Sequence, residues 1–268
     1  MSGALSGKTA FITGSERGIG KSIALAMAEA GARVAAHGLA GPAEAQALVE
    51  ELKQAGSPDV AFFGGDLRHM AAIDTLMSEV LAWGSPSVLV NNAGIQHTDA
   101  IENIAVQTWD DILAVNLSAA FHTMRYLLPH MARDGYGRVI NIASVHGLVG
   151  SVHKSPYVAA KFGLVGLSKV AALEYAAAGS VESGGVTVNC ICPGWVDTAL
   201  VAPQIAERRV QLGVSTEKAI EAMLMEKQPS RRLSSPAEIA RLALFLCHRD
   251  AHNITGTAIP MDGGWTAQ

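Results

Sequence analysis

The chain has 268 residues and is 49% hydrophobic, which is enough to bury a sizeable core and excludes intrinsic disorder. The formal net charge of −4 lacks the basic excess of a nucleic-acid-binding protein, so we expect no nucleic-acid partner. The three cysteines, Cys190, Cys192 and Cys247, have no regular spacing, so we expect buried thiols rather than a disulfide framework or a metal site.

No charged-then-apolar leader begins the chain, and no uncharged apolar run approaches the ~20 residues that span a bilayer. We therefore expect a cytoplasmic protein that does not associate with membranes. Since α/β folds of about 250 residues often form one domain, we expect a single domain over residues 1–268.

Short β-rich runs alternate with longer helical segments. The expected strands cover residues 8–13, 32–37, 60–64, 87–91, 137–143, 186–192 and 257–260. The expected helices cover residues 19–30, 42–55, 70–83, 108–131, 157–178 and 236–246. Repeated strand–helix units with apolar strands form a parallel sheet with helices on both faces. We therefore expect an α/β fold with one doubly wound sheet of about seven strands, which binds ligands at the C-terminal strand ends.

Residues 197–228 interrupt this alternation after the sixth expected strand. The segment would start at the C-terminal edge of the sheet, where ligands bind in such folds. A surface insertion would give the same pattern, but the position favours a small helical lid over the pocket.

A glycine-rich loop follows the first expected strand and reads TGSERGIG over residues 13–20. Its glycines permit a tight turn and the close approach of backbone to a pyrophosphate, and the helix N-terminus behind it offers N–H groups. Because a strand precedes the loop and a helix follows it, this context favours a dinucleotide site over a close-packed turn.

The spacing of this loop resembles that of the short-chain dehydrogenase/reductase family, and further motifs of the family follow in order. Residues 91–94 read NNAG, Asp66 follows the third strand, and Ser144, Tyr157 and Lys161 have the spacing S-x12-Y-x3-K. The resemblance spans the chain from end to end. It implies that a nicotinamide dinucleotide is bound by Thr13, Gly14, Ser15, Arg17, Gly18, Ile19, Gly20, Asp66, Leu67, Asn92, Ala93, Gly94, Tyr157, Lys161, Pro193, Gly194 and Val196.

Two places bear on the choice between NAD and NADP. After the second strand, where NAD-dependent members of the family often have an acid, residues 37–39 read HGL. Arg17 precedes Gly18, where a cation could pair with a 2′-phosphate or extend into solvent. We expect NAD, because the subgroup of the family that the chain resembles, on stretches given below, uses NAD. NADP is the alternative.

Tyr157 and Lys161 are four residues apart in an expected helix, so both project from one face. Tyrosine has an ordinary pKa of about 10, and a nearby cation favours the phenolate. With help from Lys161 and a positive nicotinamide ring, Tyr157 would remove the hydroxyl proton of an alcohol. The resemblance implies that Ser144 hydrogen-bonds the substrate oxygen and that Asn116 holds a water in a relay toward Lys161.

Polar residues and tryptophans flank these motifs. Each polar residue alone would be solvated, but together they could converge on a carboxylate near the reacting carbon. Within the family, the chain resembles the bacterial subgroup that oxidises D-3-hydroxybutyrate, in stretches such as residues 91–98 (NNAGIQHT) and 262–268 (DGGWTAQ). That subgroup holds the carboxylate with residues at the places of Gln96, His146, Lys154 and Gln204. The expected substrate-binding residues are Gln96, Ser144, His146, Lys154, Tyr157, Trp195, Gln204 and Trp265.

The resemblance therefore predicts NAD-dependent oxidation of (R)-3-hydroxybutyrate to acetoacetate, the reverse reduction, and a homotetramer. The same machinery would serve another hydroxy acid, a sugar alcohol or an acyl-carrier-bound ketone. A non-catalytic cofactor-binding regulator could share the fold, but it would not need the serine, tyrosine and lysine.

Overall fold

The structure, a computed structural model, describes residues 3–267. Its strands are β1 Thr9–Ile12, β2 Arg33–Gly38, β3 Val60–Gly64, β4 Val88–Asn91, β5 Tyr136–Ile142, β6 Gly185–Pro193 and β7 Ala258–Met261. They form one parallel sheet in the order β3-β2-β1-β4-β5-β6-β7, which confirms the expected doubly wound fold. The strand order reverses between β1 and β4, and that switch point is where such sheets open a crevice for a ligand.

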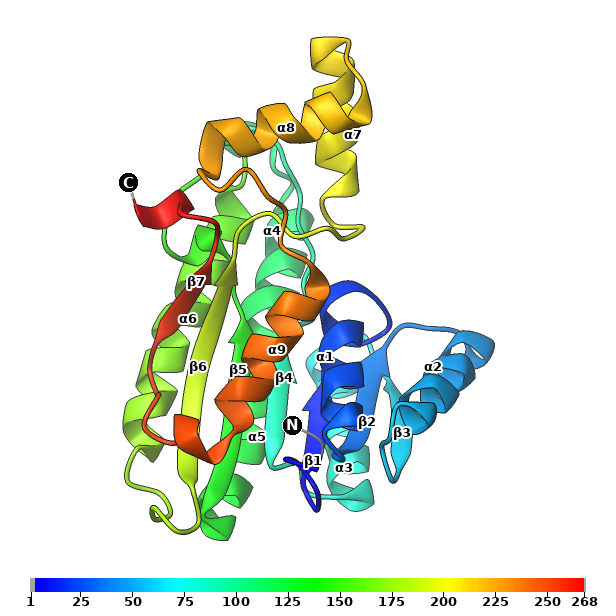
Figure 1. The fold of residues 1–268 in the computed structure, drawn as a ribbon, viewed down its shortest axis with the longest axis vertical. Coiled ribbons are helices and arrows are strands. Elements are labelled where there is room, and N and C mark those ends of the chain that lie inside the picture. The colour runs from blue at the N-terminus through cyan, green and yellow to red at the C-terminus, as the bar shows by residue number, and fades with distance from the viewer. Residues whose placement is uncertain (1–2, 268) are drawn as a thin grey trace.

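Helices cover both faces of this sheet (Figure 1). The α-helices are α1 Gly18–Glu29, α2 Pro42–Gln54, α3 Met70–Trp83, α4 Val106–Leu113, α5 Ala119–Asp134, α6 Ser155–Tyr175, α7 Ala202–Leu212, α8 Thr216–Lys227 and α9 Pro236–Cys247, of which α7 and α8 lie beyond the strand ends. One buried cluster joins α1, α2 and α9 to the sheet, and a second joins α3, α5 and α6 to the opposite face. Because both faces are covered, nearly every residue of the central strands β1, β4, β5 and β6 is buried, instead of buried and exposed residues alternating.

The long helix expected over residues 108–131 contains an irregularity. Between α4 and α5 the chain makes a π-helical turn, Ala114–Ser118, which includes the buried Asn116. A π turn inserts one extra residue into the helical ladder, and such turns often occur at functional sites. The expected single helix is therefore two α-helices, α4 and α5, joined by a π-helical turn.

The segment 197–228 forms two helices, α7 and α8, beyond the C-terminal end of β6 (Figure 1). Ser215 begins α8 because its side-chain oxygen accepts the N–H of Lys218. The two helices pack on each other through a salt bridge between Arg208 and Glu226. They lie beyond the C-terminal ends of the strands and not on a face of the sheet.

Helix α6 is the one helix within residues 3–267 that is long and apolar enough to cross a membrane. Half of its most apolar window is buried inside the fold. Several of its residues, including Leu164 and Ala172, belong to the clusters that pack on the sheet. These contacts are those of a core helix.

A buried hydrogen-bond network fixes α6 against the centre of the sheet. Asn91 on β4 donates to the Asn141 side chain on β5 at 2.8 Å, and Asn141 donates to the Ser168 hydroxyl on α6 at 2.7 Å. Thr123 on α5 completes the network by donating to Asn91 at 2.7 Å. All four side chains are buried, and breaking one bond would leave a desolvated polar group. The network therefore holds the elements that carry the site in one register.

Candidate active site

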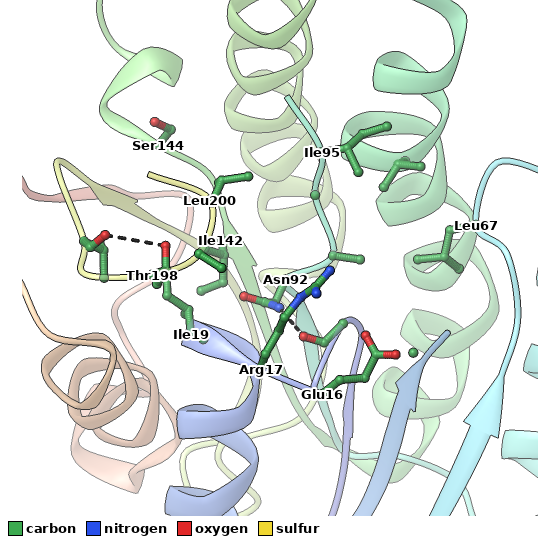
Figure 2. Close-up of a pocket in the computed structure, with 18 of the residues that line it drawn as sticks. Glu16, Arg17, Ile19, Leu67, Asn92, Ile95, Ile142, Ser144, Thr198 and Leu200 are labelled. Carbon is green, nitrogen blue, oxygen red and sulfur yellow. Dashed lines mark hydrogen bonds between the residues drawn. The ribbon is translucent and has the colours of Figure 1, made fainter. Parts of the chain in front are cut away.

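A cavity of about 580 Å³ opens at the C-terminal ends of the central strands (Figure 2). The volume is in the range of ordinary ligand sites. Residues from the glycine loop, the NNAG motif, the ends of β5 and β6, and α6 all line it. Of the residues expected to bind cofactor, those that line it are Gly14, Arg17, Gly18, Ile19, Asp66, Leu67, Asn92, Ala93, Gly94, Tyr157, Lys161, Pro193, Gly194 and Val196.

The three remaining residues of that set shape the loop and do not line the cavity. The Thr13 hydroxyl oxygen accepts two backbone N–H groups of the NNAG motif, at 3.0 and 3.1 Å. The Ser15 hydroxyl accepts the His37 N–H at 2.9 Å. Gly20 packs so closely on Gly14 that a Cβ would overlap the Gly14 carbonyl oxygen. Thr13, Ser15 and Gly20 therefore fix the path of the loop around the cavity.

His37 is a structural residue of this site that the sequence motifs did not reveal. Its Nδ1 accepts the Gly14 N–H at 3.3 Å, and its Nε2 lies 2.9 Å from the Gly65 carbonyl oxygen, to which it donates in the matching neutral tautomer. The imidazole thus ties the glycine loop to the end of β3. Burial lowers the pKa of His37 to about 4.

We expect this histidine to make the fold acid-sensitive. The pKa of His37 is about 4 in the folded state and 6.5 without burial. Below pH 6.5 the unfolded chain therefore binds more protons. This contribution to stability is fully present above pH 6.5 and is lost as the pH falls toward 4. Between pH 7 and pH 5 the loss is about 2 kcal/mol for this one group.

Urea unfolding of the wild type and of His37→Gln at both pH values measures this effect. The fall in unfolding free energy between pH 7 and pH 5 should be smaller in the variant by about 2 kcal/mol. His146, whose pKa burial also lowers to about 4, is present in both proteins and cancels in the comparison. Equal losses in the two proteins would show that His37 does not titrate as its burial requires.

Ser144, Tyr157 and Lys161 meet at the inner end of the cavity. The Ser144 oxygen accepts the backbone N–H of His146 at 3.1 Å. The Lys161 ammonium lies 5.6 Å from the centre of the Tyr157 ring and donates to the Ile142 carbonyl oxygen at 2.8 Å. The serine, the tyrosine and the lysine are all buried.

The protein by itself holds Tyr157 as a neutral phenol. Burial raises the pKa of Tyr157 to about 12, and a hydrogen bond with Ser144 opposes that rise. Burial also lowers the pKa of Lys161 to about 8. Desolvation of the phenolate is thus the largest influence on the Tyr157 pKa in the protein alone, and the expected help from a positive nicotinamide ring beside Lys161 would act against it.

Asn116 lies next to this group but is engaged with the backbone. Its side chain accepts the Ile95 N–H and donates to the Ile95 carbonyl oxygen, both at 2.8 Å. A second cavity of about 10 Å³ is lined by Asn116 and Lys161. That is about the room that one water molecule needs.

Three of the expected substrate residues form a cluster between α6 and the 197–228 segment. The Lys154 ammonium donates to the Gln204 side-chain oxygen at 2.8 Å and lies 5.2 Å from the Trp195 ring centre. Burial lowers the pKa of Lys154 to about 8. Gln96 reaches the same segment, with its amide nitrogen 3.5 Å from the Leu200 carbonyl oxygen. Lys154 is therefore a buried cation that forms no ion pair with a carboxylate of residues 3–267.

An aromatic chain links this cluster to the tyrosine. The Trp195 and Trp265 rings lie 5.7 Å apart, and the Trp265 and His146 rings lie 5.5 Å apart. His146 then lies 6.3 Å from Tyr157, edge to face. The His146 Nδ1 and Trp195 Nε1 atoms are buried and have no hydrogen-bond partner within residues 3–267. The structure thus brings seven of the eight expected substrate residues into one linked group, with Gln96 at its edge.

The family model for the short chain dehydrogenases matches residues 8–209, three-quarters of the chain. The chain belongs to the short-chain dehydrogenase family. This short-chain dehydrogenase is therefore an oxidoreductase, and the resemblance read from its motifs is confirmed.

Its relatives match it over nearly their whole length. It is 45% identical to the D-beta-hydroxybutyrate dehydrogenase of Rhizobium meliloti, over 97% of this chain and 99% of the relative. It is 46% identical to the D-beta-hydroxybutyrate dehydrogenase of Cupriavidus necator, over 98% of this chain and 100% of the relative. A protein of Beutenbergia cavernae assigned as an NAD(P)-dependent gluconate 5-dehydrogenase, solved with NADP at low occupancy, superposes with a TM-score of 0.86 at 31% identity, over 98% of each chain.

The cavity of this dehydrogenase is also lined by residues to which the sequence motifs assigned no cofactor or substrate contact. They include Glu16, His37, Gly38, Leu39, Arg68, Thr198 and Leu200. The available signal was position, since Glu16 stands inside the glycine loop and residues 37–39 end β2. What each of them contributes depends on contacts between segments far apart in the sequence.

Proposed function

We propose that this short-chain dehydrogenase oxidises (R)-3-hydroxybutyrate to acetoacetate with NAD and catalyses the reverse reduction. The observation that carries the proposal is the buried Lys154 beside Gln204, linked through aromatic rings to Tyr157. A buried cation costs free energy unless an anion joins it, and a substrate carboxylate would supply that charge. The Trp195 Nε1 and His146 Nδ1 atoms, which have no partner among the described residues, offer further hydrogen-bonding atoms in the same group. The names of the two relatives at 45% and 46% identity support this substrate.

The residues around the cavity fit a nicotinamide dinucleotide. Gly14 has a φ of +63°, and a Cβ there would meet the Ala93 Cα at 3.0 Å, so glycine lets this loop turn tightly against the NNAG motif on the cavity wall. The N-terminus of α1 begins at Gly18 on the cavity wall and offers unpaired N–H groups. When bound, the cofactor supplies a hydride acceptor and, in its oxidised form, a positively charged ring.

The side chains at the inner end divide the proton chemistry between them. Tyr157 takes the proton of the substrate hydroxyl, and Ser144 hydrogen-bonds the same oxygen. Lys161 holds a positive charge beside the phenolate that forms. Asn116 and Lys161 border the cavity of about 10 Å³, where one water would pass the proton onward.

The segment 197–228 serves as a lid over a single catalytic domain, residues 1–268. Gln204 at the start of α7 already contacts Lys154, so the lid lies against the start of α6, and a substrate carboxylate would take both side chains as partners in place of this contact. Closure of this kind excludes water and strengthens the charge interactions inside. We further propose a cytoplasmic homotetramer; light scattering on the purified protein tests the assembly.

The decisive assay follows nicotinamide reduction with (R)-3-hydroxybutyrate, and compares NAD with NADP and the R with the S enantiomer. We expect turnover that prefers NAD and the R enantiomer. Turnover with NADP alone would keep the substrate and change the cofactor. Absence of turnover with both NAD and NADP would rule out 3-hydroxybutyrate as the substrate. Longer hydroxy acids, polyols and acyl-carrier-bound ketones would then be assayed.

A further inference from the structure

We propose that Glu16 is the residue that selects NAD over NADP in this chain, by accepting hydrogen bonds from the hydroxyls of the adenosine ribose. The inference rests on the proposed function, because it concerns the cofactor of that same site. Dinucleotide-binding folds commonly use an acid that follows the second strand for this contact. Here β2 ends at Gly38 and Leu39 follows, so no acid stands at that place.

The Glu16 side chain fills the space that a residue 38 side chain would occupy. A Cβ built on Gly38 would overlap the Cγ, Cδ and Oε1 atoms of Glu16. The carboxylate of the glycine loop is therefore at the C-terminal end of β2, and both residues line the cavity. Gly38 and Glu16 depend on each other. A larger residue at position 38 would displace the Glu16 side chain, and a shorter residue at position 16 would not reach the end of β2.

The Glu16 carboxylate is free to accept hydrogen bonds. It is half-buried, and within residues 3–267 the structure gives it neither a hydrogen bond nor an ion pair. The neighbouring carboxylate on the cavity wall, Asp66, is instead bound by Arg68, with an Nη2–Oδ2 distance of 2.6 Å. Arg68 also reaches Asp111 at 3.5 Å, so its charge is already shared between two carboxylates. Arg68 is therefore a poor partner for a ligand phosphate.

Arg17 is the cation that would oppose this selection. It is exposed and lines the cavity next to Glu16 in sequence. Figure 2 shows that the two side chains extend in different directions, with Arg17 reaching past Asn92. A ribose at the end of β2 therefore meets the carboxylate first. Ribose hydroxyls donate to a carboxylate, whereas a 2′-phosphate carries nearly two negative charges and is repelled by it.

Calorimetric titration of the purified full chain with NAD and with NADP tests the proposal without turnover. Glu16→Gln should weaken NAD binding by about tenfold and strengthen NADP binding by about tenfold, since it removes both an acceptor and a repelling charge. Glu44→Gln, which removes the same charge from the exposed first turn of α2, should leave both dissociation constants unchanged.

A second variant moves the carboxylate instead of removing it. Glu16→Ala combined with Gly38→Asp places an acid on β2 and relieves the overlap between the two side chains. This double variant should regain the NAD preference that Glu16→Ala alone loses. Thermal unfolding of every variant confirms that the changes in binding occur in folded protein.

The outcomes distinguish a failure of the Glu16 inference from a failure of the proposed function. If wild type binds both dinucleotides and Glu16→Gln leaves the ratio of dissociation constants unchanged, Glu16 is not the determinant and the inference fails alone. A ratio that shifts only in Arg17→Ala would also overturn it, and would assign the choice to Arg17. If wild type binds neither dinucleotide, the proposed function fails and this inference with it.

Discussion

Replacing Tyr157 with phenylalanine is expected to lower kcat by about 10³-fold while the dissociation constant for NAD stays near the wild-type value. The phenylalanine ring keeps the edge-to-face contact with His146, whose ring lies 6.3 Å away. Only the hydroxyl is lost, and with it the group that takes the substrate proton. Steady-state kinetics and calorimetric titration of NAD measure the two effects separately.

A large effect is expected because the site must stabilise the Tyr157 phenolate by several kcal/mol before the hydroxyl can act as a base. Burial raises the pKa of Tyr157 to about 12, so a phenolate near pH 7 needs about 7 kcal/mol of additional stabilisation. A unit charge at the 5.6 Å that separates the Lys161 ammonium from the ring centre supplies about 3 kcal/mol at an effective dielectric constant of 20. A positively charged cofactor ring and Ser144 must supply the remainder. The phenolate therefore forms only in the assembled complex.

Tyr136→Phe is the matched control for this substitution. The Tyr136 hydroxyl donates to the Cys247 carbonyl oxygen at 3.0 Å, at the start of β5 and far along the strand from the cavity. Its loss should lower stability by about 1 kcal/mol and leave turnover unchanged. Wild-type turnover by Tyr157→Phe would exclude this tyrosine as the base, and equal losses in both variants would indicate a folding defect.

The sheet and its helices were predictable because their signals are local. Each strand is an apolar run bounded by turn residues, and the seven observed strands agree with the expected ones to within about two residues, the usual uncertainty of such boundaries. The π-helical turn at Asn116 was not predictable in this way. It is stabilised by the two hydrogen bonds between Asn116 and Ile95, which lie 21 residues apart.

The residues that line the cavity were predictable in part, but the electrostatics of the candidate site were not. The motifs named fourteen expected cofactor-binding residues that line the cavity, because these residues stand in the motifs themselves, but they did not name Glu16, Arg68 or Thr198. The upward shift of the Tyr157 pKa could not be predicted from the sequence, because it depends on how deeply the fold buries the phenol. The overlap of Glu16 with Gly38 was not available either, since it joins a loop to a strand end that only the folded backbone brings together.

Replacing Lys154 with methionine is expected to lower kcat/KM for (R)-3-hydroxybutyrate by about 30-fold or more, since removing one partner of a buried charge pair costs at least about 2 kcal/mol. Methionine keeps most of the length and apolar stem of lysine, so the packing beside Trp195 is largely retained. Lys218→Met, which removes the same charge from an exposed position on α8, should leave kcat/KM unchanged.

Substrate chemistry and pH then identify what Lys154 binds. Because the pKa of Lys154 is about 8, its ammonium is charged below pH 8, and the wild-type KM for the hydroxy acid should rise as the pH passes that value. Lys154→Met should show no such rise, and it should reduce a neutral ketone of similar size, such as butanone, as well as wild type does. If Lys154→Met instead impairs the charged and the neutral substrate equally, the lysine positions Trp195 and Gln204 rather than a carboxylate. The hydroxy-acid substrate would then lose its principal support in this chain, and a polyol or acyl-carrier-bound ketone would fit the site better.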